Sequence, residues 1–327
     1  MYEKILITGG AGFIGSFLVE RLLDSGREVA VLDDFSTGRR ENLAAVGKNE
    51  KLQIFTGDVT TDTDLVDRLV AEADAVIHLA AAVGVELVVD DPARTISTNV
   101  RGSENVFFAA AKHHKRLIAA STSEVYGKSE ADFFRETDDL HLGSPYNSRW
   151  SYACSKLLDE FLLMALCRNA RLQGTIVRFF NTVGPRQTGR YGMVLPRFVR
   201  AALDGKALRV YGDGRQTRCF CHVSDTVSAL MLLLENEKSF GKIYNIGSSE
   251  MVTIGDLAHK VIAICGGSSA IENIPYDQAY AAGFEDMRHR RPDTTALKEL
   301  TGWQTRYDLT QIIEDIRVYM SKSEKII

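Results

Sequence analysis

Tyr152 and Lys156 are the residues of this chain whose types and spacing most directly suggest chemistry. They stand four positions apart, and on a helix this spacing places both side chains on one face, one turn apart. A lysine ammonium beside a phenol stabilises the phenolate, so we expect Lys156 to lower the pKa of Tyr152 from about 10 toward the working range. Tyr152 is then a candidate general base for a sugar or alcohol hydroxyl. An exposed Tyr/Lys pair without a catalytic role has the same spacing.

A glycine-rich run at residues 9–15 follows an expected strand and opens an expected helix. Glycines at such a turn allow close backbone approach to a pyrophosphate, which the helix N-terminus then binds. Asp33 ends the next strand, where its carboxylate can bind the adenine ribose hydroxyls and repel a 2′-phosphate. The run therefore favours NAD over NADP, although a glycine-rich turn without a ligand would read the same. Asp58 follows the third strand and is a candidate for the adenine amine, or else a helix N-cap.

Strands and helices alternate through the first half of the chain, which predicts an α/β fold with a Rossmann-like, doubly wound parallel sheet. After residue 180 the pattern loosens into a smaller, irregular C-terminal substrate lobe. We expect an NAD-binding domain over 1–180, completed by parts of 220–250, and a lobe over 181–327 that mainly binds a nucleotide sugar. The expected strands lie at 4–8, 28–32, 52–55, 75–79, 116–120, 173–179 and 243–246, and the expected helices of the first half at 13–23, 62–71, 92–113 and 150–169.

Composition excludes several classes of function. The chain has 327 residues and a formal net charge of -4, without the clustered basic surface that nucleic-acid binding requires. Its five cysteines lack the spacing of a metal site, so no metal is expected. No apolar run reaches membrane-spanning length and no signal peptide is visible, so we expect a soluble cytoplasmic protein.

Taken together, the glycine run, Asp33, the segments 78–81 and 121–127, Asn99 and the Tyr152/Lys156 pair resemble the extended short-chain dehydrogenase/reductases. These are NAD-dependent epimerases, dehydratases and decarboxylases of nucleotide sugars, and the resemblance covers nearly the whole chain. It implies that Tyr152 takes a proton from the sugar 4-hydroxyl, that Lys156 also binds the nicotinamide ribose, and that Thr122 hydrogen-bonds the same sugar hydroxyl. It also implies a homodimer formed through helices 92–113 and 150–169.

The resemblance assigns three sets of site residues. The catalytic set is Thr122, Tyr152, Lys156, Ser123 and Glu124. The set expected to bind NAD is Gly9, Gly12, Phe13, Ile14, Gly15, Asp33, Asp34, Ser36, Gly38, Asp58, Val59, Leu79, Ala80, Ala81, Asn99, Tyr152 and Lys156. The set expected to bind a UDP-sugar is Thr122, Ser123, Asn181, Arg190, Val194, Tyr211, Arg218 and Arg290.

Residues 121–127 bear on the reaction. Sugar 4,6-dehydratases typically carry an aspartic acid where this chain has Ser123, which disfavours dehydration. The run is similar to UDP-glucuronate decarboxylases, in which Glu124 and Arg290 would lie near the substrate carboxylate. A salt-bridged structural acid is the other interpretation of Glu124.

A second resemblance favours a different product. Arg190 and Met193 are spaced as in UDP-glucuronate 4-epimerases, where an arginine fork holds the sugar carboxylate. An exposed loop charge is the alternative for Arg190. On this basis we expect 4-epimerisation of UDP-glucuronate, with decarboxylation to a UDP-pentose or 4-epimerisation of a neutral UDP-hexose as alternatives. A net NAD-dependent dehydrogenase and a non-catalytic NAD-binding regulator also remain open.

Overall fold

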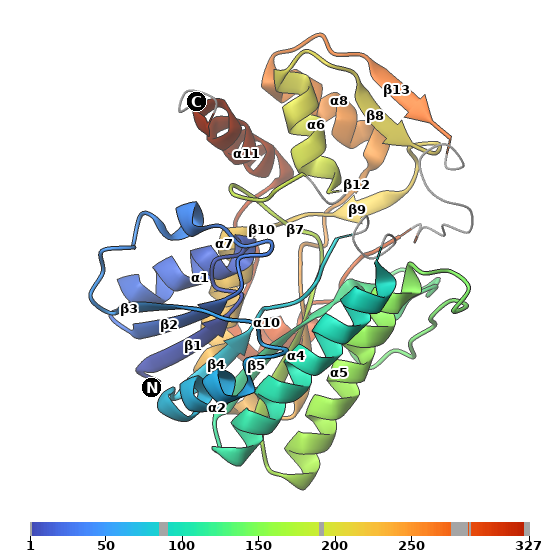
Figure 1. Cartoon of the computed structure of the whole chain (residues 1–327). Helices are drawn as coiled ribbons and strands as arrows, with labels where there is room; N and C mark the ends of the chain where they lie inside the picture. The colour runs from blue at the N-terminus through green and yellow to red at the C-terminus, as the bar shows by residue number, and fades with distance from the viewer. Residues whose placement is uncertain (1, 85–90, 190–192, 276–286, 288, 324–327) are drawn as a thin grey trace.

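A seven-stranded parallel sheet forms the centre of the computed structural model, which describes residues 2–84, 91–189, 193–275, 287 and 289–323 (Figure 1). All its neighbouring strands pair in parallel. The strand order is β11 (Lys242–Ile246), β6 (Gln173–Phe179), β5 (Arg116–Thr122), β4 (Ala75–His78), β1 (Lys4–Thr8), β2 (Glu28–Asp33) and β3 (Leu52–Thr56). The predicted α/β, Rossmann-like fold is confirmed.

Helices cover both faces of the sheet. Successive strand residues point to opposite sides, and apolar residues on both sides need to be buried. Ile5 and Ile7 of β1 pack with one set of helices, whereas Leu6 packs with the other. The first set contains α1 (Phe13–Asp24) and α7 (Val223–Leu234), with α10 (Thr295–Thr301) beside them. The second set is α2 (Thr63–Glu72), α4 (Pro92–Lys112) and α5 (Trp150–Asn169). The last two lie side by side in Figure 1.

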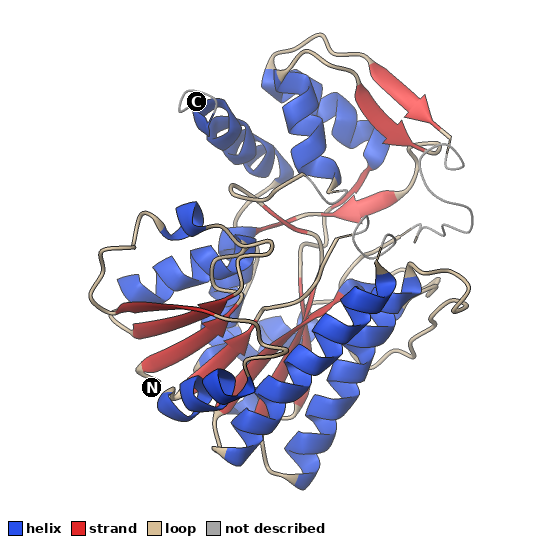
Figure 2. Cartoon of the chain, in the orientation of Figure 1, coloured by secondary structure: helices blue, strands red, loops and turns tan. Residues whose placement is uncertain are grey.

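Apart from three short 3-10 helices that pack beside the sheet, the remaining elements form a smaller lobe above the carboxyl edge of the sheet (Figure 2). Its core joins α6 (Val194–Leu203), α8 (Ile254–Cys265) and α11 (Leu309–Ser323). Three short strand pairs complete it: β8 (Leu208–Tyr211) with β13 (Ile271–Ile274), β9 (Thr217–Cys219) with β12 (Met251–Thr253), and β7 (Thr182–Val183) with β10 (Cys221–His222). Short 3-10 helices are η1 (Arg40–Leu43), η2 (Ser123–Tyr126) and η3 (Glu237–Ser239). In the part of the chain that the structure describes, no helix has the length and apolar character to cross a bilayer.

The chain enters the lobe three times. It leaves the sheet at the end of β6, builds β7, α6, β8 and β9, and returns through α7 to β11 at the sheet edge. It then enters the lobe again for α8 and β13, comes back to α10, and ends in the lobe with α11. The carboxyl ends of the central strands therefore face the lobe, and ligands of open α/β sheets bind at this edge. The division of roles between residues 1–180 and 181–327 stays a prediction.

Candidate active site

The turn between β1 and α1 is a cradle that only glycine can form. Gly9 has φ +73°, and a Cβ there would lie 2.8 Å from the Ala80 nitrogen. A Cβ on Gly15 would lie 2.2 Å from the Gly9 carbonyl oxygen. Gly12 is the N-cap of α1 and supplies no side-chain cap to the first turn. The helix N-terminus thus offers uncapped N–H groups in a space kept clear of side chains, which fits a pyrophosphate.

Asp33 lies at the end of β2 beside this turn. Its carboxylate oxygens accept hydrogen bonds from the Ala11 and Phe35 amides, both at 2.9 Å. Burial raises the pKa of Asp33, and the two amide bonds oppose the rise. Gly38 backs the carboxylate, since a Cβ there would lie 2.6 Å from its Oδ1 atom. The acid is thereby held at the strand end where a ribose would lie.

One cavity of about 370 Å³ extends from this cradle to the Tyr152/Lys156 pair. Of the residues predicted to bind the cofactor it is lined by Gly9, Gly12, Phe13, Ile14, Gly15, Asp33, Asp34, Ser36, Asp58, Val59, Leu79, Ala80, Ala81, Tyr152 and Lys156. Gly38 lies behind Asp33, and Asn99 is buried and bonds the Ala82 backbone and the Ser155 hydroxyl. Asp58 accepts the Thr60 amide at 2.7 Å, which fixes the turn after β3.

Other lining residues were not predicted individually. They include Thr37, Arg94, Thr98, Ser121 and Phe179. Ser121 is the last residue but one of β5 and Phe179 is the last of β6, and both could have been found from that position alone. Arg94 and Thr98 lie in the first turns of α4, where the sequence gives no comparable signal.

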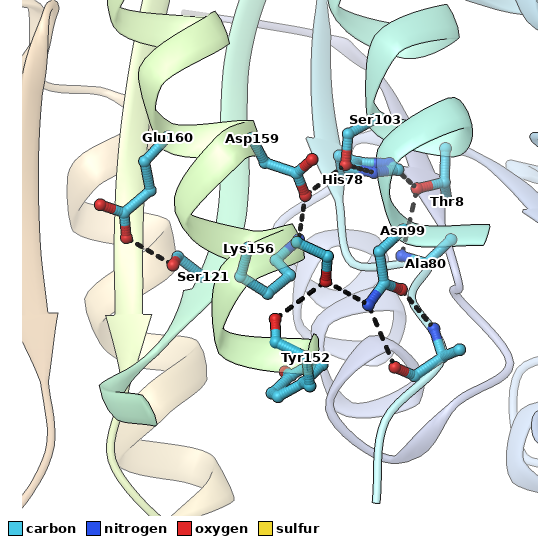
Figure 3. Close-up of polar contacts among 12 residues, drawn as sticks. Thr8, His78, Ala80, Asn99, Ser103, Ser121, Tyr152, Lys156, Asp159 and Glu160 are labelled. Carbon is cyan, nitrogen blue, oxygen red and sulfur yellow. Dashed lines mark hydrogen bonds and ion pairs between the residues drawn. The ribbon is translucent and has the colours of Figure 1, made fainter. Parts of the chain in front are cut away.

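Tyr152 lies in the first turn of α5, and Thr122 at the end of β5 hydrogen-bonds its phenol. The predicted lowering of the pKa of Tyr152 by Lys156 is wrong for this structure. Burial and the Glu124 carboxylate raise that pKa, and the Thr122 bond opposes them only in part. Lys156 instead donates from Nζ to Asp159 Oδ2 at 2.8 Å (Figure 3). A four-residue spacing fixes the face of the helix but not which neighbour takes the lysine charge.

Glu124 follows Thr122 on η2 and lies among guanidinium groups. Its Oε1 atom is 3.0 Å from Arg290 Nη1 and 3.6 Å from Arg149 Nη2. Burial would raise the pKa of Glu124, but Arg149, Arg290 and Arg218 outweigh it and the pKa is lowered. Ser123, the first residue of η2, is buried beside this cluster. The site therefore holds a carboxylate whose ionised form is favoured by the guanidinium groups around it.

The family comparison decides between the classes that this geometry allows. The model of the NAD dependent epimerase/dehydratase family matches residues 5–247. The chain belongs to this family. Its description names NAD, as the glycine cradle and Asp33 predicted.

Relatives in the family include decarboxylases and epimerases. The chain is 42% identical over 310 residues to UDP-N-acetyl-alpha-D-glucosaminuronate decarboxylase of Bacillus cytotoxicus, covering 92% of each chain. It is 37% identical to UDP-glucuronic acid decarboxylase 4 of Arabidopsis thaliana, covering 96% of this chain and 68% of that one. The solved UDP-glucose 4-epimerase of Thermotoga maritima superposes with a TM-score of 0.88 at 30% identity, covering 98% and 99%.

The remaining predicted substrate residues lie apart from Tyr152 in the chain and come mainly from the lobe. Arg218 of β9 donates to the Met287 carbonyl at 2.9 Å. Asn181 donates to the Cys219 carbonyl at 2.9 Å, and Tyr211 accepts from Arg197. Val194 begins α6 and packs on the lobe core. Arg190 lies outside the described residues.

Among the described residues, no group of three or more His, Cys, Asp or Glu side chains is placed to hold an ion. The positive charge around Glu124 comes from arginines, which bind carboxylates and phosphates through planar forks.

Replacing Gly15 with alanine tests the cradle. The new Cβ would meet the Gly9 carbonyl oxygen at 2.2 Å, so the turn must shift and open. We expect NAD affinity to fall by about tenfold or more, measured by calorimetric titration. Gly255→Ala in α8 is the matched control, because the nearest atom to its Cβ lies at 3.5 Å. Equal affinities for Gly15→Ala and the parent would contradict a pyrophosphate at this turn.

Proposed function

We propose that this protein is a decarboxylase of a UDP-linked uronic acid. The observation that carries the proposal is the arginine-bound Glu124, which stands two residues after Thr122 and raises the pKa of Tyr152. The cluster therefore lies within electrostatic reach of the group expected to act on the sugar. The 42% identical relative is named as a decarboxylase of a UDP-linked uronate, which supports the same reaction class.

The charge balance of the cluster suits a substrate carboxylate. Arg149 and Arg290 contribute two positive charges against the single negative charge of Glu124. Arg218 adds a third at longer range. A uronate carboxylate that enters this cluster would meet guanidinium forks, whose planar geometry pairs well with a carboxylate. The arginines thus favour a hexuronate over a neutral hexose.

Tyr152 and Thr122 would act on the sugar 4-hydroxyl. Tyr152 accepts its proton as general base, and Thr122, already bonded to the phenol, orders the two oxygens. The glycine cradle and Asp33 would hold NAD, which would supply the hydride chemistry at C4 and, in its oxidised form, a positive charge that favours a phenolate. In the return direction the protonated phenol supplies the proton to the C4 oxygen.

Glu124 gives a physical reason for carbon dioxide to leave. Oxidation at C4 makes the substrate a β-keto acid, whose C5–carboxylate bond breaks when its electron pair can pass to the ketone. A substrate carboxylate placed among the arginines lies near a second carboxylate, Glu124, that the same arginines keep ionised. Loss of neutral carbon dioxide removes that repulsion, so the ground state is raised relative to the transition state. C5 then takes a proton, and re-reduction at C4 leaves no net redox change.

The lobe is the proposed binding place of the nucleotide. Arg218 and Arg290 supply charge at the junction between lobe and sheet, and Asn181 stands where the chain enters the lobe. Both UDP-glucuronate and its 2-acetamido counterpart fit the charge argument. The relatives that carry these two substrates in their names are 37% and 42% identical.

Epimerisation at C4 stays the second candidate. The position of Arg190 in the sequence favours 4-epimerisation, although Arg190 lies outside the described residues. A solved relative that is 30% identical is a 4-epimerase. The relatives named as decarboxylases support the other reaction, and the described part of the site offers Glu124 for it. An epimerase has to keep the substrate carboxylate while it presents the other face of the ketone to the hydride. The negative charge of Glu124 would repel the substrate carboxylate and so favour its loss.

The deciding experiment uses the full chain with NAD and each of the two UDP-uronates. A product lighter by the mass of carbon dioxide supports decarboxylation. An isobaric product with a new retention time supports 4-epimerisation and contradicts the proposal. Steady accumulation of NADH would instead indicate a net dehydrogenase.

A homodimer is also proposed, as the resemblance implied. Helices α4 and α5 expose apolar side chains on their paired surface: Phe161 is 65% exposed, Leu158 52%, Phe108 49% and Ile96 42%. A second copy of the chain would bury them.

Light scattering should give the mass of two chains for the parent protein. Phe161→Glu places a charge on this surface and should shift the measured mass toward that of one chain.

Tyr152→Phe tests the general base. It removes the phenol oxygen and keeps the ring, so we expect turnover of the UDP-uronate to fall by about 10²–10⁴-fold with NAD affinity retained. Tyr146→Phe is the control, because Tyr146 is 97% exposed. Turnover within a few-fold of the parent would remove Tyr152 from the reaction.

Glu124→Gln tests the repulsion between carboxylates. The amide keeps the shape and loses the charge, so kcat should fall by about 10–100-fold while KM stays level or falls. Glu314→Gln is the control, since Glu314 pairs with Arg317 in an exposed position of α11. A raised KM with unchanged kcat would mean that Glu124 only organises the arginines.

A further inference from the structure

A buried polar chain connects Lys156 to the cofactor cradle through Asp159 (Figure 3). Asp159 Oδ2 accepts from Lys156 Nζ at 2.8 Å and from Ser103 Oγ at 2.7 Å. Ser103 Oγ lies 3.3 Å from His78 Nε2, and His78 Nδ1 lies 2.7 Å from Thr8 Oγ1. All five side chains are buried.

The charge of Asp159 fixes the direction of every bond in this chain. An ionised carboxylate only accepts, so the Ser103 hydroxyl must donate to it. Ser103 can then only accept from His78, which places the histidine proton on Nε2. His78 Nδ1 is left as an acceptor, so Thr8 donates to it. The Thr8 oxygen also accepts the Ala80 amide, 3.4 Å away in the cradle wall, so the direction of its own O–H is set on the His78 side.

Neutral histidine is required at the middle of the chain, and burial supplies that condition. Burial lowers the pKa of His78 to about 3, and the nearby Lys156 charge adds to the effect. A protonated ring would donate from both nitrogens and reverse the Thr8 bond. The network therefore has one consistent arrangement while Asp159 stays ionised.

We propose that Asp159 is a positioning residue of the reaction, which holds the Lys156 ammonium and, through Ser103 and His78, orders Thr8 against the cofactor cradle. The part that concerns turnover rests on the proposed function. The part that concerns His78 stands on these contacts alone. Lys156 is one half of an ion pair with Asp159, and it is not among the groups that lower the pKa of Tyr152.

Several charged groups face Tyr152 and set its titration together. Glu124 from η2 and Asp159 from α5 raise the pKa of Tyr152, whereas Arg290, from the segment before α10, lowers it. Lys156 lies on the same helix as Tyr152, paired with Asp159. Neutralising Asp159 leaves the lysine charge uncompensated, so the phenolate becomes easier to form.

Asp159→Asn is the main test, because the amide oxygen can still accept from Lys156 and Ser103. Activity that needs the phenolate rises with pH, so a lowered pKa moves the acidic limb of the kcat/KM profile to lower pH, by about one unit. Asp67→Asn is the matched control: it breaks an exposed Asp–Lys pair with Lys112 and should leave the limb in place. An unmoved limb in a folded Asp159→Asn protein would overturn the catalytic part of the proposal.

The His78 tautomer is the second readout, and it needs no substrate. Nitrogen-15 NMR of the parent should show a neutral ring with its proton on Nε2, assigned against a His78→Asn variant. Ser103→Ala cuts the link to Asp159, so the Nδ1–H form should appear beside it while the Lys156 pair remains. A parent ring protonated on Nδ1, or a tautomer insensitive to Ser103→Ala, would overturn the network. If neither UDP-uronate is turned over, the proposed function fails and this measurement alone decides the inference.

Discussion

Parallel pairing of β1, β4 and β5 is the constraint on which the site depends. The register places Thr8 beside His78, and His78 beside Ala119. The chain segments that leave these strands therefore start at one edge: the glycine turn, the loop at Leu79 and η2 with Glu124. Residues far apart in sequence therefore lie close together at this edge as a consequence of the strand register alone. The edge supplies backbone amides and strand ends, and α5 supplies Tyr152 and Lys156.

Buried charges at this edge of the sheet occur in two arrangements. Lys156 and Asp159 form a balanced pair whose remaining hydrogen-bonding capacity goes to Ser103. Glu124 instead lies among several guanidinium groups, which lower its pKa. The first arrangement pairs one charge with one partner, whereas the second surrounds a single carboxylate with arginines from different segments. Under the proposals above, the first would order neighbouring groups and the second would bind the substrate carboxylate.

Much of the fold could be predicted because it rests on local signals. Long helices such as Pro92–Lys112 and buried strands such as Ala75–His78 carry clear periodicity. The paired strands of the lobe could not be predicted, since two-residue strands such as Thr182–Val183 have no period to detect. The glycine cradle and Asp33 follow from spacing along one segment. The pKa of Tyr152 cannot be predicted from such spacing, because burial and the position of Glu124 are properties of the assembled fold. Asp159 lies three residues after Lys156 on one helix, so that contact was within reach of the same spacing argument.

In the proposed reaction, the choice of product would depend on whether Glu124 stays ionised. Its folded pKa is lowered, so the stabilisation from its arginine contacts is complete above the ordinary glutamate range and is lost only as the pH falls through the lowered value. Across the neutral range Glu124 therefore presents a negative charge to any carboxylate that the arginines attract. Under the proposed function, the same groups would bind the substrate and make its carboxylate costly to keep once C4 is a ketone. Release of carbon dioxide would end that repulsion, whereas inversion at C4 would leave it in place, and this difference is the physical basis for proposing the lighter product.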